Sequence, residues 1–261
     1  MDLGLNGRRA IVAAASQGLG YAIAHRLAGE GCRVEICSRS ETAIGAAAER
    51  ITTETGSDVR GSVVDVADSA AVRSWVDDAA DRFGGLDIVV PNAGGPPASP
   101  FSETAESDWD AAYRLTLRSA MAFAAASHPH LKATRGTILY LTSSSVREPI
   151  PQIALSGIFR LAVAGLAKTL ASEWGTDGIR VNQLIPGRIS TERVAHLDGR
   201  IAEATGTSVE DVRRRSEGSI PLGRYGEPSD FAAAAAFLVS PAASYITGAT
   251  LQVDGGAIRA I

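Results

Sequence analysis

The chain has 261 residues, of which 45% are hydrophobic and 21% are charged, and its formal net charge is −4. This composition is ordinary for a globular protein and excludes the basic surface of a nucleic-acid-binding protein. The weakly polar stretches are too short to span a bilayer, and the N-terminus does not resemble a signal peptide. Cys32 and Cys37 fit neither a metal pair nor a disulfide framework. We therefore expect a cytoplasmic protein with reduced, half-buried cysteines, no metal and no membrane partner.

Apolar runs of strand length alternate with amphipathic segments of helix length along the chain. Strands are expected at 10–14, 33–37, 59–64, 86–91, 137–142, 180–185 and 250–253. Helices are expected to begin near Gly20, Glu41, Ser69, Ser107, Ile153 and Glu227. The strand segments are nearly continuous in Val, Ile and Leu, which is typical of strands covered on both faces. This pattern predicts a doubly wound, Rossmann-like α/β fold with a parallel sheet of about seven strands and helices on both faces.

No linker or shift in composition divides the chain, so we expect one domain over residues 1–261. The segment 188–221 is polar and irregular, and it interrupts the strand rhythm. Long excursions at the carboxyl ends of a parallel sheet are usually binding loops or lids. We therefore expect a substrate loop or lid here, with a solvated helical pair without a role as the alternative.

The first strand runs directly into small residues at the start of a helix. The residues of this turn that are expected to bind a pyrophosphate are Ala14, Ser16, Gln17, Gly18, Leu19 and Gly20. Glycines let the backbone approach the phosphates, and the helix N-terminus directs N–H groups at them. Ala14 stands where a glycine is usual and fits the turn only if its φ is negative, so we expect a slightly displaced phosphate loop.

The second strand ends in Ser38 and Arg39, nineteen residues after Gly20. An acidic residue at this place would bind the ribose 2′-hydroxyl of NAD, whereas a serine beside an arginine accommodates the 2′-phosphate of NADP. We therefore predict NADP(H) as the cofactor. The alternative is a surface arginine on a turn.

Polar or small residues also follow the later strands. These segments are Asp65-Val66, Asn92-Ala93-Gly94, Thr142 to Ser145, Pro186 to Thr191 and Val253 to Gly256. In this order and spacing, the whole chain resembles the short-chain dehydrogenase/reductase family. The resemblance implies that Asp65 and Val66 contact the adenine and that Asn92, Ala93 and Gly94 leave room for the ribose and nicotinamide. It also implies nicotinamide contacts from Pro186, Gly187, Ile189 and Thr191.

The family's catalytic positions are changed in this chain. In the family, a tyrosine protonates the new alkoxide, a lysine four residues later lowers its pKa, and a serine and an asparagine assist. Alignment without gaps places these positions at Ser156, Arg160, Ser143 and Thr116, so only the serine is retained. A serine hydroxyl is a far weaker acid than a phenol, whose pKa is about 10. Ser143, Ser156 and Arg160 are the candidate catalytic residues, and Arg160 is also expected to clamp the cofactor ribose.

Three functions therefore stay open. The first is an NADP(H)-dependent oxidoreductase that acts on a small carbonyl or alcohol compound. The second is a non-redox enzyme, such as a cyclase, dehydratase or isomerase, and the third is a non-catalytic NADP-binding protein. Arg147 and Glu148 lie near the expected substrate entrance but lack the spacing to replace the tyrosine.

The remaining expectations concern the core, the substrate and the partners. Tyr140 is expected to pack in the core. Ile150, Ile153 and Leu155 favour a mostly apolar carbonyl substrate. The helices over 107–128 and 153–173 are apolar on more than one face, so their outer sides must be covered. Because family members pair these helices between subunits, the resemblance implies a homo-oligomer, in particular a tetramer.

Overall fold

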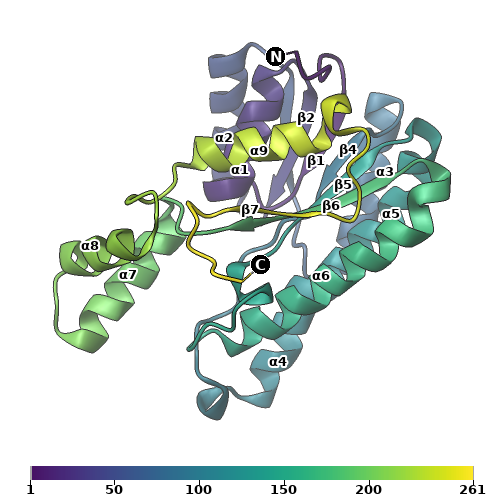
Figure 1. Ribbon diagram of the computed structural model, residues 1–261. Helices are drawn as coiled ribbons and strands as arrows, with labels where there is room; N and C mark the ends of the chain where they lie inside the picture. The colour runs from purple at the N-terminus through teal and green to yellow at the C-terminus, as the bar shows by residue number, and fades with distance from the viewer. Residues whose placement is uncertain (1, 261) are drawn as a thin grey trace.

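The computed structural model describes residues 2–260. Its centre is a sheet of seven parallel strands in the order β3-β2-β1-β4-β5-β6-β7, with helices on both faces (Figure 1). This arrangement confirms the predicted Rossmann-like α/β fold. The strands are β1 (Arg9–Val12), β2 (Arg33–Ser38), β3 (Val59–Val63), β4 (Ile88–Val90), β5 (Thr137–Leu141), β6 (Arg180–Pro186) and β7 (Thr250–Val253).

The helices form one layer on each face of the sheet. Their bounds are α1 (Gly18–Gly29), α2 (Glu41–Thr55), α3 (Ser69–Phe83), α4 (Glu106–Ala112), α5 (Ser119–Thr134), α6 (Ala154–Trp174), α7 (Glu192–Thr205), α8 (Val209–Ser219) and α9 (Pro228–Val239). Helices α1, α2 and α9 cover one face, and α3, α5 and α6 cover the other (Figure 1). A π-helical turn, Tyr113–Arg118, joins α4 to α5. Helices α7 and α8 project beyond the sheet as a pair.

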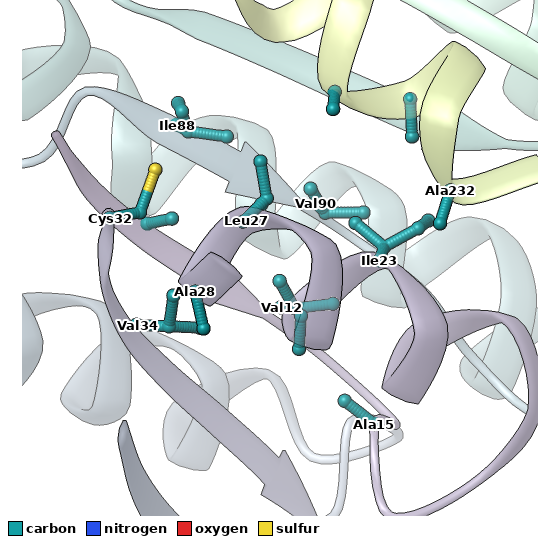
Figure 2. Packing of buried hydrophobic residues seen from close by; sticks show 14 of the residues in the cluster. Val12, Ala15, Ile23, Leu27, Ala28, Cys32, Val34, Ile88, Val90 and Ala232 are labelled. Atoms are coloured by element: carbon teal, nitrogen blue, oxygen red, sulfur yellow. The ribbon is translucent and has the colours of Figure 1, made fainter. Parts of the chain in front are cut away.

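The core on the α1 face shows why these segments form strands and helices. Val12, Val34 and Val90 come from three neighbouring strands and pack against Ile23 and Leu27 of α1 (Figure 2). All five side chains are fully buried. Burial of such a side chain contributes about 1.5–3 kcal/mol. The parallel register then holds the carboxyl ends of β1, β2 and β4 at one edge of the sheet.

The segment 188–221 is not irregular: it contains α7 and α8, a helical pair as in the alternative expectation. Thr191 and Ser208 cap the N-termini of α7 and α8 with their hydroxyl groups, and Gly206 ends α7 in a left-handed conformation. Few residues of this pair are buried, among them Ala202 and Val212. The polar composition favoured an irregular segment, although apolar residues such as Val194, Leu197 and Ile201 recur at helical spacing.

The burial of Tyr140 and of the two cysteines can be compared with the predictions. Tyr140 is buried, as predicted, and its hydroxyl donates to the carbonyl of Ala120 at 3.3 Å. Both cysteines are fully buried rather than half-buried. Burial raises the pKa of the Cys32 and Cys37 thiols to about 12. Because the thiolate is the reactive form, these cysteines are inert packing residues.

Candidate functional site

A cavity of about 1120 Å³ lies at the carboxyl ends of the strands. It brings together Ser143, Ser156, Arg160 and every residue predicted to bind the cofactor except Gly20. The cofactor candidates in its lining are Ala14, Ser16, Gln17, Gly18, Leu19, Ser38, Arg39, Asp65, Val66, Asn92, Ala93, Gly94, Arg160, Pro186, Gly187, Ile189 and Thr191. The cofactor candidates come from five strand ends and α6, and Ser143 follows a sixth strand, β5, so their proximity follows from the parallel order. Their roles stay predictions.

The turn between β1 and α1 differs from the expected one. Ala14 has a φ of +47°, so the expectation of a negative φ was wrong. The turn keeps a left-handed residue despite the cost of a Cβ atom, about 1–2 kcal/mol. The Asn92 side-chain amide donates to the carbonyl oxygen of Ala14 at 3.2 Å and helps to hold this conformation.

Gly20 does not line the cavity but packs directly behind the β1–α1 turn. A Cβ atom at this position would lie 2.6 Å from the carbonyl oxygen of Ala14 and 2.9 Å from the amide nitrogen of Asn92. Gly20 therefore lets α1 pack against the turn. The N-terminus of α1 has no side-chain cap from Gln17 and no acidic residue in its first turn. Its free N–H groups and partial positive charge suit an anion such as a phosphate.

The end of β2 presents a free cation. Arg39 is exposed and makes no ion pair with any residue from 2 to 260. The Ser38 hydroxyl donates to the carbonyl of Ser40 at 3.2 Å. At the end of β3, the Asp65 carboxylate accepts a hydrogen bond from the N–H of Ala67 at 3.0 Å. The acid is thus engaged in its own turn, whereas the guanidinium of Arg39 is available to a ligand.

The β6 and β7 side of the cavity is closed by backbone contacts. The N–H of Gly187 donates to the carbonyl of Val253 at 2.9 Å, and a Cβ atom on Gly187 would lie 2.5 Å from the Cα atom of Asp254. The Thr191 hydroxyl accepts a hydrogen bond from the N–H of Val194 at 3.4 Å as the cap of α7. Thr191 therefore has a structural role in addition to the predicted contact with the nicotinamide.

A buried ion pair fixes α7 beside the cavity. Arg188, which follows Gly187, binds one oxygen of Asp198, and the Tyr225 hydroxyl donates to the other oxygen at 2.9 Å. Asp198 is 3% exposed, so it requires both partners. The network orients one face of α7, with Arg193, Leu197, Arg200 and Ile201, towards the cavity.

The reactive end of the cavity is formed by α6 and the loop after β5. The oxygen of Ser143 accepts hydrogen bonds from the N–H and the hydroxyl of Ser145, at 3.2 and 2.9 Å. Ser156 is 8% exposed and lies one helical turn before Arg160. None of the five tyrosines of the chain is followed four residues later by a lysine.

The Arg160 side chain reaches the carboxyl ends of β4 and β5. Its guanidinium donates to the carbonyl of Leu141 and, at 3.2 Å, to the carbonyl of Ala93. These bonds use two of its five N–H groups and leave three for a ligand. Burial, together with the nearby charge of Arg193, lowers the pKa of Arg160 to about 10. Arg160 is therefore still a cation at neutral pH.

Thr116 lies behind Arg160 on the π-helical turn. Its hydroxyl oxygen is buried and lacks a hydrogen-bond partner within residues 2–260. A second cavity of about 10 Å³ is lined by Thr116, Asn92 and Arg160. Such a volume accommodates about one water molecule. A water molecule in this small cavity could hydrogen-bond to both the Thr116 hydroxyl and the Arg160 guanidinium.

The lining of the cavity differs in part from the predicted one. Ile150 and Ile153 line the cavity as expected, but Leu155 is buried at 1% exposure and does not. Arg193 and Arg200 were missed because α7 was interpreted as irregular. Their helical spacing with Leu197, at i, i+4 and i+7, was the available signal. Glu148 accepts hydrogen bonds from the N–H groups of Arg259 and Ala260, at 2.8 and 2.9 Å, and so ties down the chain beside the cavity.

Comparisons with known proteins agree with this architecture. A family model described as enoyl-(acyl carrier protein) reductase matches residues 13–257. A tropinone reductase homologue from Arabidopsis thaliana is 36% identical over 256 residues, which cover 97% of this chain and 80% of the relative. D-threitol dehydrogenase from Mycolicibacterium smegmatis is 34% identical over 258 residues, covering 98% of this chain and 94% of the relative.

A solved structure extends the comparison to the whole fold. The structure of L-sorbose reductase from Gluconobacter frateurii, complexed with NADPH and L-sorbose, superposes with a TM-score of 0.94. The two sequences are 29% identical, and the match covers 100% of both chains. With the strand order, the cavity at the strand ends and these relatives in agreement, the chain belongs to the short-chain dehydrogenase/reductase family.

Proposed function

We propose that this protein is an NADP(H)-dependent oxidoreductase that acts on the carbonyl or alcohol group of a small molecule. The observation that carries the proposal is the unpaired guanidinium of Arg39 in the same cavity as the uncapped N-terminus of α1. A 2′-phosphate and a pyrophosphate are the anions that these two features suit. L-sorbose reductase, which has the same fold, is an NADPH complex in its solved structure.

The residues of the cavity fit a dinucleotide. Gly18 has a φ of +63°, and a Cβ atom there would meet nothing within 4 Å, so the backbone is open to a phosphate. Arg39 and Ser38 hold the 2′-phosphate, and Asp65 and Val66 flank the adenine. The free N–H groups of Arg160 hold the ribose. The nicotinamide end lies among Asn92, Ala93, Gly94, Pro186, Gly187, Ile189 and Thr191.

The chemistry then depends on few side chains. When bound, NADPH supplies a hydride to the carbonyl carbon. Ser143 already accepts two hydrogen bonds from Ser145, so its own proton is free to bind the carbonyl oxygen and orient it. The π-electron pair of the carbonyl moves to that oxygen, which takes a proton from water. Ser156 is a far weaker acid than a phenol, and Arg160 stays protonated near neutral pH.

The identity of Ser156 also favours a second candidate. A site that lacks the usual proton donor suits a non-redox enzyme, such as a cyclase, dehydratase or isomerase, on the same fold. A non-catalytic NADP-binding protein is the third possibility, and the complete lining of the cavity argues against it.

Titration with NADPH, followed by its absorbance in the presence of a panel of carbonyl compounds, tests the proposal. We expect NADPH to bind and to be oxidised as the carbonyl is reduced. Ser143→Ala should lower turnover and leave the affinity for NADPH nearly unchanged. Binding without oxidation would favour the second or third candidate, and substrate conversion at constant NADPH absorbance would identify the second. A protein that does not bind NADPH would overturn the first and third candidates and leave the second, which does not require a nicotinamide.

We further propose that the chain forms a homo-oligomer, in particular a tetramer. Ile158 and Leu161 on the outer face of α6 are 49% and 56% exposed. The stretch Ala154–Asp177 is apolar and long enough to cross a membrane, but it carries Ser156 and Arg160 into the cavity. A second copy of the chain is therefore the proposed cover for its outer face. Leu161→Glu should reduce the sedimenting mass, and a monomer before the substitution would contradict the proposal.

A further inference from the structure

Three arginine side chains face the reactive half of the cavity, and none is paired with a carboxylate of the described residues. Arg160 binds backbone carbonyls, and Arg200 donates to the carbonyl of Ala98 at 3.1 Å. The side chain of Arg193 makes neither a hydrogen bond nor an ion pair with any residue from 2 to 260. A partly desolvated cation without a counter-charge is costly, and a bound anion would offset that cost.

The guanidinium of Arg193 packs against a glycine. Arg193 is the second residue of α7, and its guanidinium lies so close to Gly95 that a Cβ atom there would overlap with it. Gly95 directly follows the segment from Asn92 to Gly94 at the end of β4. Arg193 therefore lies over the reactive end of the cavity and away from Arg39, which follows β2.

Arg193 lies close enough to Arg160 for its charge to act on that guanidinium. The charge of Arg193 contributes to the lowered pKa of Arg160, and burial lowers the pKa of Arg193. Two like charges that repel each other attract an anion between or beside them more strongly than either charge alone.

The carboxylates of the cavity do not fill this role. Asp254 accepts hydrogen bonds from the N–H groups of Gly256 and Ile258, and Glu148 accepts from those of Arg259 and Ala260. Asp65 lies at the end of β3, beside Arg39, and accepts from Ala67. Glu192 precedes Arg193, but consecutive residues of a helix point in different directions, and the two form no ion pair.

We propose that the substrate carries a carboxylate and that Arg193 binds it, which makes the substrate an oxo acid or the corresponding hydroxy acid. The planar guanidinium matches a carboxylate with two parallel hydrogen bonds. Val194, Leu197 and Ile201 supply an apolar wall beside it, which suits a hydrocarbon segment between the acid and the carbonyl. This inference rests on the proposed function, because it names the substrate class of the same site.

The test compares acids with their uncharged esters. Pyruvate, acetoacetate and levulinate, each with its methyl ester, are titrated calorimetrically into protein saturated with NADP⁺, which cannot reduce them. We expect at least one acid to bind about 10- to 100-fold more tightly than its ester, the range of a charge-assisted hydrogen bond. Arg193→Gln should abolish that difference. Arg214→Gln is the matched control, because Arg214 is 77% exposed and outside the cavity, and it should change nothing.

Turnover is measured separately with NADPH and the same compounds. If the acids bind through Arg193 but none is reduced, the inference holds and the proposed function fails. If esters and acids bind equally, or Arg193→Gln changes neither, the inference is overturned whether or not turnover occurs. A loss of NADPH affinity in Arg193→Gln at an unchanged acid-to-ester ratio would assign Arg193 to the cofactor and also overturn it.

Discussion

The half of the cavity at β1, β2 and α1 is shaped by close backbone contacts, whereas the half at α6 and α7 presents long arginine side chains among apolar ones. In the first half, Gly20 and the carbonyl of Ala14 are in close contact, and the helix N-terminus is left open. In the second half, Arg160 and Arg193 reach into the cavity from two helices. A site made of backbone restricts which residues can stand there, but a site made of side chains can change its chemistry by substitution alone.

Gly20→Ala should have the largest effect, because the added Cβ atom would lie 2.6 Å from the carbonyl oxygen of Ala14. Overpacking of this kind costs about 1–3 kcal/mol of folding free energy, and displacement of α1 should abolish NADPH binding. Thermal unfolding and NADPH titration measure the two effects. Gly45→Ala on α2 is the matched control, because its Cβ atom would meet nothing within 4 Å and should not harm stability. Normal cofactor binding by Gly20→Ala would show that the close backbone contact at β1 and α1 is not needed for the site.

Arg160→Ala tests the half made of side chains. It removes the N–H groups that are proposed to bind the ribose, and we expect a loss of about 1.5–3 kcal/mol in NADPH affinity. The bonds to the carbonyls of Leu141 and Ala93 are lost as well, which should lower stability. Arg160→Lys keeps the charge and should recover part of the loss.

The proposed contact between Arg160 and the ribose should make the affinity for NADPH depend on pH. Arg160 is charged below its pKa of about 10, so NADPH affinity should be constant near neutrality and should fall as the pH rises through that value. Arg160→Ala should show no such fall. An equal decline in both proteins would mean that Arg160 does not hold the cofactor.

Arg39→Asp tests the preference for NADP(H) over NAD(H). This preference is proposed to depend on Arg39 at the end of β2. Because the substitution replaces an unpaired cation by an acid beside the ribose, the preference should change from NADP(H) to NAD(H), by about tenfold or more. Isothermal titration of both cofactors measures the ratio. Equal affinities before the substitution would contradict the assignment.

Ala14→Gly should have the smallest effect and the opposite sign. A glycine removes the cost of the positive φ, about 1–2 kcal/mol, but makes the unfolded chain more flexible by about 0.4–1 kcal/mol. The net result should be a stabilisation of up to about 1 kcal/mol in thermal or urea unfolding. Ala13→Gly is the control at a buried neighbour with an ordinary φ and should destabilise the protein. A clear destabilisation by Ala14→Gly would show that the turn is not strained.

The sequence predicted the features that depend on periodicity and on strand ends. The inner strands were found because their apolar runs, such as Ile88 to Val90, are buried on both faces, whereas the edge strands β3 and β7 are partly exposed. The residues of the strand ends share one cavity because a parallel order requires it. The helices α7 and α8 were only the alternative expectation, because their polar composition outweighed the helical spacing of Val194, Leu197 and Ile201. The φ of Ala14 and the position of Arg193 depend on contacts with Asn92 and Gly95, which are distant in sequence.

The lining of the cavity runs from Ala14 to Ile258, and this has a consequence for how the protein is made. On a ribosome, the first part of the site is synthesised long before the last part, so no partial chain possesses the complete cavity. Parallel strands also pair residues that are far apart in the sequence, which makes such sheets slow to form. A ligand stabilises only the state that binds it. A dinucleotide would therefore protect the finished molecule from degradation and leave an unfinished one unprotected.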